Sequence, residues 1–154
     1  IPGGVETPLL LLDEARMQRN VARMQSRMDA LGVRFRPHVK TSKCPEVVRR
    51  QLAAGARGIT VSTLKEAERF LAEGVTAILY AVAVVPGKLD HALRLARGGA
   101  RLTLLVESVD PAACVAWAIG RYTRRLYGIG SCGSVVALPA ALPEIERQLT
   151  QRKK

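Results

Sequence analysis

The chain alternates short apolar runs with longer stretches of helical periodicity. Residues 8–13 read PLLLLD, an apolar run of strand length after a proline, which predicts a buried strand. Over residues 14–31 the period changes, and apolar side chains recur every three or four positions, at Met17, Val21, Met24 and Met28. This spacing predicts one amphipathic helix that ends at Gly32 and packs its methionine stripe into the core.

After Gly32 the chain repeats a strand followed by a helix four times. The predicted strands are residues 33–40, 59–62, 77–82 and 101–109, and the predicted helices are about 44–54, 64–72, 88–96 and 111–119. Near-continuous apolar strands joined by helices are typical of a parallel sheet covered on both faces. The sequence therefore predicts an α/β fold, either a doubly wound sheet or half of a (β/α)₈ barrel, which takes about 250 residues in full.

Residues 119–154 do not continue this repeat. YTRRLY gives way to GIGSCGS, then to Pro139 and Pro143 and a polar end. Three glycines fit GxGxxG formally, but no apolar strand precedes them and no acidic residue follows about 20 positions on. We expect a structured region over residues 1–118 and a divergent tail over 119–154.

The segment RFRPHVKTSK, residues 34–43, carries the candidate chemistry. As a strand it places Arg34, Arg36, His38 and Lys40 on one face. A solvated edge strand explains such a face, but in a barrel it would point inward, with Lys40 at the strand end where barrel enzymes keep their catalytic groups. A lysine there can form a Schiff base, because partial burial and nearby cations lower its pKa. Pyridoxal phosphate, an aldehyde with a phosphate, suits both the amine and the cations.

Three stretches resemble the N-terminal region of bacterial D-threonine aldolases and, more distantly, D-serine dehydratases and the alanine racemase N-terminal domain. They are TPLLLLD, RMQRNVARMQSRMDALGVRFRPHVKTSK and GITVSTLKEAERFLAEGVTAILYAV, within about residues 7–118. The resemblance implies a fold type III pyridoxal-phosphate enzyme, here a partial (β/α)₈ TIM barrel with about four parallel βα units. It also implies that residues 8–13 contribute a strand to a C-terminal β-domain.

In such enzymes the lysine of the RPHxKT motif holds the cofactor, which implies Lys40, and His38 and Thr41 of the same motif would flank it. Tyr80, at the end of the third predicted strand, is a further candidate for cofactor binding, with barrel packing as the alternative. The divalent metal of such aldolases would be held by His and Asp residues of a C-terminal domain, outside this chain. We therefore expect a truncated enzyme.

The implied reaction is retro-aldol cleavage of a D-β-hydroxy-α-amino acid to glycine and an aldehyde. The stretch RMQRN to RMQSRMDA favours the aldolase by resemblance. Elimination of water, as in D-serine dehydratase, and an inactive fragment that folds without cofactor remain the alternatives.

Composition and charge limit the kinds of partner that the sequence predicts. The net charge is +11, which raises the question of nucleic acid, but two Phe, three Tyr and one Trp leave little surface for base stacking. No apolar run approaches the roughly 20 residues of a membrane span, and no leader pattern opens the chain. Three cysteines without CxxC spacing indicate reduced thiols. We expect a cytoplasmic protein with a small D-amino acid substrate, no nucleic-acid or membrane partner, and a homo-oligomer as one way to cover the open strand edges.

Overall fold

The computed structural model describes residues 4, 6, 8–107, 115 and 135–137. Helices and strands follow in the order α1 (Glu14–Ala30), α2 (Pro45–Ala53), β1 (Ile59–Val61), α3 (Leu64–Ala72), β2 (Ala77–Ala83), the 3₁₀ helix η1 (Pro86–Lys88), α4 (Leu89–Arg97), β3 (Arg101–Leu105) and β4 (Val135–Ala137). β1, β2 and β3 are parallel neighbours, and β4 pairs antiparallel with β3. The predicted α/β class with parallel βα units is confirmed.

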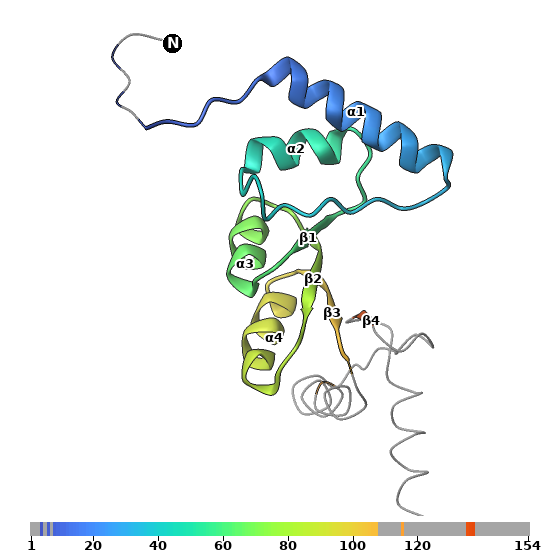
Figure 1. The fold of residues 1–154 in the computed structure, drawn as a ribbon. Helices are drawn as coiled ribbons and strands as arrows, with labels where there is room; N and C mark the ends of the chain where they lie inside the picture. The colour runs from blue at the N-terminus through green and yellow to red at the C-terminus, as the bar shows by residue number, and fades with distance from the viewer. Residues whose placement is uncertain (1–3, 5, 7, 108–114, 116–134, 138–154) are drawn as a thin grey trace, which may run out of the picture.

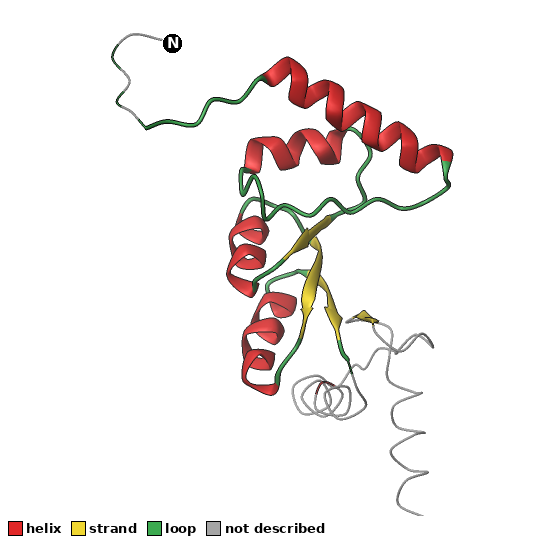
Figure 2. Ribbon diagram, viewed as in Figure 1, coloured by secondary structure: helices red, strands yellow, loops and turns green. Residues whose placement is uncertain are grey.

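The helices α3 and α4 lie on the same side of the parallel strands (Figure 1). Figure 2 shows a helix after β1 and another after β2, which is the βα order that the sequence predicts. Polar residues set the helix starts. The Asp13 carboxylate accepts the Arg16 N–H at the start of α1 over 2.8 Å, and Thr63 with Glu66 forms a capping box at the start of α3.

One face of the sheet forms the core. Residues in register across β1, β2 and β3 point to the same face, and the six on the side of α3 and α4 are fully buried: Ile59, Val61, Ile78, Tyr80, Leu102 and Leu104. Phe70 of α3 and Ala92 of α4 pack against them. We call this the core face, and the opposite side, which bears Thr60, Leu79 and Thr103, the Thr60 face.

The strand predicted over residues 33–40 is reduced to a single parallel bridge between His38 and Thr60. The Thr60 N–H donates to Pro37 O over 2.8 Å, and the Val39 N–H donates to Thr60 O over 2.9 Å. Before the bridge, the next N–H of a parallel ladder would come from Pro37, which has none. After the bridge, Val39 O accepts instead from Lys43 N–H, over 2.9 Å. The backbone thus runs beside β1 without a continuous ladder.

The prediction of a buried strand over residues 8–13 is wrong for the described structure. Leu10, Leu11 and Leu12 are 100%, 68% and 64% exposed and form no strand. A strand needs a neighbour for its backbone groups, and the described part of the chain offers none to this run. The apolar run alone therefore does not decide the structure.

The methionine stripe of α1 lies at the surface of the fold and not in its core. Met17 and Met28 are half-buried, and Met24 is 45% exposed. Gln25 is the buried residue of α1, and its amide donates to the Asp29 carboxylate over 2.8 Å. The helix predicted over 111–119 lies, except for Val115, outside the described residues. No helix in the described ranges is long and apolar enough to cross a membrane.

Candidate functional site

A row of side chains crosses the Thr60 face. Thr60 is in register with Leu79, Leu79 with Thr103, and the bridge adds His38 beside Thr60. Partners across parallel strands present their side chains to the same face. His38 therefore lies on the Thr60 face, on the opposite side of the sheet from the buried core, and Lys40 follows at the carboxyl end of the bridge.

His38 is bonded through both ring nitrogens. Its Nδ1 accepts the backbone N–H of Lys40 over 3.3 Å, and its Nε2 lies 3.3 Å from the Ser62 hydroxyl oxygen. Because Nδ1 acts as an acceptor, a neutral ring carries its proton on Nε2, which then donates to Ser62. Neutral His38 thus links the Lys40 backbone to the residue that follows β1.

Lys40 and Thr41 are both exposed. The sequence predicts a partly buried Lys40, and in the described structure Lys40 is not buried. The structure nevertheless brings His38 and Lys40 together, and Thr41 is the next residue. Their predicted roles toward a cofactor stay predictions.

Arginines add positive charge to the Thr60 face. The Arg36 guanidinium donates to the Thr103 hydroxyl over 3.4 Å. Partial burial and the charges of Arg34 and Arg101 hold the pKa of Arg36 below its ordinary value. In the described ranges no carboxylate forms an ion pair with Arg36. This uncompensated charge favours an anion.

Tyr80 does not join this group. Its side chain is fully buried on the core face, and its hydroxyl accepts a hydrogen bond from Lys88 Nζ over 2.9 Å. Val61 and Leu104 are its neighbours in register, so it points away from His38. The structure supports the packing alternative for Tyr80.

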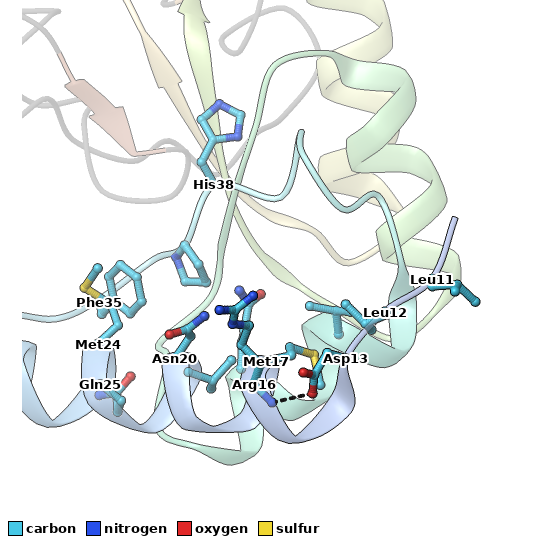
Figure 3. A pocket seen from close by; sticks show the side chains of 14 residues that line it. Leu11, Leu12, Asp13, Arg16, Met17, Asn20, Met24, Gln25, Phe35 and His38 are labelled. Carbon is cyan, nitrogen blue, oxygen red and sulfur yellow. Dashed lines mark hydrogen bonds between the residues drawn. The ribbon is translucent and has the colours of Figure 1, made fainter. Parts of the chain in front are cut away.

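A hollow of about 640 Å³, which His38 also lines, lies between α1, α2 and residues 35–38. Its walls are largely apolar, with Met17, Val21, Phe35 and Val47 among them. Figure 3 shows the His38 ring turned away from the α1 side chains that line this hollow. The Asp13 carboxylate, which also lines the hollow, already accepts a hydrogen bond from the Arg16 N–H. The hollow therefore offers packing surface, whereas the chemistry gathers around Lys40.

Two residues that were not predicted as part of the site, Lys43 and Glu66, join the Lys40 loop to the end of β1. Glu66 accepts backbone N–H groups from Ser62 and Thr63, over 2.8 and 3.2 Å, and its other oxygen lies 3.2 Å from Lys43 Nζ. The spacing of Thr63 and Glu66 is the capping-box pattern, which is readable from sequence. The tie to Lys43 is tertiary and leaves no such signal. In the described part of the chain, no group of three or more His, Cys, Asp or Glu could hold a metal ion.

Comparisons with known proteins agree with this arrangement. A family model described as "Alanine racemase, N-terminal domain" matches residues 12–124. A D-threo-3-hydroxyaspartate dehydratase of Delftia sp. (strain HT23) is 60% identical over 117 residues, which cover 76% of this chain and 30% of that protein. A D-threonine aldolase of Arthrobacter sp is 38% identical over 154 residues, which cover 94% of this chain and 40% of that protein.

Solved structures show the same fold. A variant of D-threo-3-hydroxyaspartate dehydratase in its metal-free form matches with a TM-score of 0.78 and 47% identity, over 96% of this chain and 41% of that one. The D-threonine aldolase from Filomicrobium marinum matches with a TM-score of 0.71 and 34% identity, over 76% of this chain and 32% of that one. The chain thus spans 30 to 41% of the length of these relatives. The expected resemblance to D-threonine aldolases and the partial barrel class are confirmed, and the chain belongs to the alanine racemase N-terminal-domain family.

Proposed function

We propose that this chain carries the lysine side of a pyridoxal-phosphate lyase site that acts on D-β-hydroxy-α-amino acids. The observation that carries the proposal is the position of Lys40. It lies two residues after the His38–Thr60 bridge, and its backbone N–H donates to His38 Nδ1. Barrel enzymes place their reacting groups at this carboxyl end of the strands. Family membership supports the same assignment.

The residues present fit this cofactor chemically. Lys40 offers a primary amine for the aldehyde, and Arg36 adds positive charge on the Thr60 face without a carboxylate partner in the described ranges. When bound, pyridoxal phosphate supplies the electron sink for cleavage at the amino-bearing carbon. His38 holds the backbone of Lys40 in place, and Thr41 is exposed beside it. Lys40 is the residue that we assign to covalent attachment.

Two reaction types compete for this site. The resemblance of the α1 region favoured the aldolase, but among the relatives above the dehydratase has the higher identity, 60% against 38%. Both are named for D-amino acids with a β-hydroxyl group. We propose retro-aldol cleavage as the first candidate, on the resemblance of the α1 region, and elimination of water as the second, on the higher identity. Both reactions break a bond of the amino-bearing carbon.

Cofactor titration tests the shared step. Pyridoxal phosphate added to the whole chain should change the absorbance of the cofactor, and Lys40→Arg, which keeps the positive charge but not the reactive amine, should abolish the change. Product analysis then separates the reactions. Glycine and an aldehyde from D-threonine indicate the aldolase, whereas ammonia and an oxo acid from D-threo-3-hydroxyaspartate indicate the dehydratase. An absorbance change in Lys40→Arg equal to that of the wild type would overturn the assignment of Lys40.

A further inference from the structure

Lys43 and Glu66 meet where pairing between the Lys40 segment and β1 stops. Lys43 Nζ lies 3.2 Å from Glu66 Oε1, and the Glu66 side chain is only 11% exposed while that of Lys43 is 64% exposed. The partly buried carboxylate comes from the first turn of α3, and the ammonium comes from the loop that follows Lys40. This contact therefore joins two elements that are distant in the sequence.

The same two residues replace the next rung of the parallel ladder. After the His38–Thr60 bridge, a continued ladder would have the Ser62 N–H donate to Val39 O. Instead, Ser62 N–H donates to Glu66 Oε2 over 2.8 Å, and Val39 O accepts from Lys43 N–H over 2.9 Å. Both backbone groups released by the missing rung are thus satisfied, and the ion pair ties their two new partners together.

The backbone of Lys43 has an unfavourable conformation that its contacts must hold in place. Its φ is 47°. Among the residues that the structure describes, Lys43 is the one non-glycine residue with a positive φ. Such a conformation is unfavourable for a side chain with a Cβ and persists where the surroundings hold it. Lys43 is held at both ends, by its N–H on Val39 O and by its ammonium on Glu66. The turn that carries Thr41 and Ser42 is closed by these two contacts.

We infer that the Lys43–Glu66 pair is a positioning clamp for Lys40. It fixes the end of the loop that begins at Lys40, while His38 fixes the start through the Lys40 N–H. The inference rests on the proposed function, because it assigns a purpose to the fixed position of the Lys40 amine. Glu66 and Lys43 act through the loop and do not touch the reacting atoms.

Four single variants isolate the clamp. Glu66→Gln keeps an oxygen for the Ser62 and Thr63 N–H groups, as in a capping box, but loses the charge that holds Lys43. Lys43→Met removes the same ion pair from the other side, and Lys43→Arg keeps the charge. Arg69→Met is the matched control, because Arg69 pairs at 3.2 Å with Glu73 at the other end of the same helix and its side chain is 70% exposed.

Two quantities are measured on the whole chain. The first is amide hydrogen exchange at Lys43 and Ser62, with Thr60 as the internal reference. The second is the rate at which pyridoxal phosphate followed by borohydride labels Lys40 relative to Lys65. Because an ion pair with one exposed partner, here Lys43, is worth a modest free energy, we expect Glu66→Gln and Lys43→Met to speed exchange and to slow relative labelling by about two- to fivefold. Lys43→Arg and Arg69→Met should match the wild type.

The outcomes separate the two proposals. Faster exchange with slower Lys40 labelling in both clamp variants, rescued by Lys43→Arg, supports the clamp. Normal Lys40 labelling in both variants, whatever their exchange rates, overturns the clamp and leaves the proposed function standing. No labelling of Lys40 in the wild type overturns both.

Discussion

Gly58 decides how closely β1 approaches β2, and its replacement by alanine should strongly destabilise the fold. Its φ is +144°, and a Cβ built on it would lie 2.4 Å from the carbonyl oxygen of Ala77 and 2.9 Å from the Ala77 Cβ. Both atoms belong to the first residue of β2, so no side-chain rotation relieves the clash. The backbone conformation costs about 1–3 kcal/mol and overpacking a further 1–3 kcal/mol. Gly58→Ala should therefore lower the free energy of unfolding by about 2–6 kcal/mol.

Gly74→Ala is the matched control for this prediction. Gly74 also has a positive φ, +85°, but nothing lies within 4 Å of the added Cβ. It should cost only the conformational term, about 1–2 kcal/mol. Urea unfolding followed by far-ultraviolet circular dichroism gives both values from the midpoints, provided that the m-values agree. If Gly58→Ala is no more destabilising than Gly74→Ala, the close approach of β1 to β2 is wrong.

Two further predictions follow from Tyr80 and Glu66. Tyr80→Phe removes the hydrogen bond from Lys88 and should lower the free energy of unfolding by about 0.5–1.5 kcal/mol. The absorbance titration with pyridoxal phosphate should not change, and weaker cofactor binding in this variant would indicate that Tyr80 belongs to the site. At Glu66, burial raises the pKa, but the hydrogen bonds from Ser62, Lys43 and Thr63 outweigh it, so the pKa lies below the ordinary 4.5. A lowered carboxyl pKa contributes stability that is present above the unfolded value and lost as the pH falls through the folded one. Urea unfolding at a series of pH values below about 5 should therefore show a shallower loss of stability for Glu66→Gln than for the wild type, and equal slopes would contradict the lowered pKa.

Much of the fold could be predicted because local signals and burial agree. α3 has its capping box and its apolar face in the sequence, and the predicted bounds of residues 64–72 match the observed helix. β2 and β3 are apolar runs whose alternate residues, such as Ile78 and Leu102, are buried in register. Here pattern, propensity and packing favour the same structure.

The failures occurred where tertiary contacts decide. Residues 8–13 form an apolar run, yet a run of leucines becomes a strand only beside a partner strand. Pro37 interrupts the ladder beside β1 because it has no N–H to donate, and this signal is visible in the sequence. Tyr80 was a candidate for the site from its position in a strand, with packing as the alternative, and the alternation of faces directs its side chain to the core.

The identity of the lysine that reacts with pyridoxal phosphate is the most direct test of the central claim. Lys65 serves as an internal reference, because its side chain is 84% exposed and pairs with Glu68 on the surface of α3. After brief treatment with limiting cofactor and borohydride, peptide mass spectrometry should find the reduced adduct on Lys40 well before Lys65. Labels distributed over the lysines according to their exposure, with Lys65 modified as fast as Lys40, would contradict a cofactor site at Lys40.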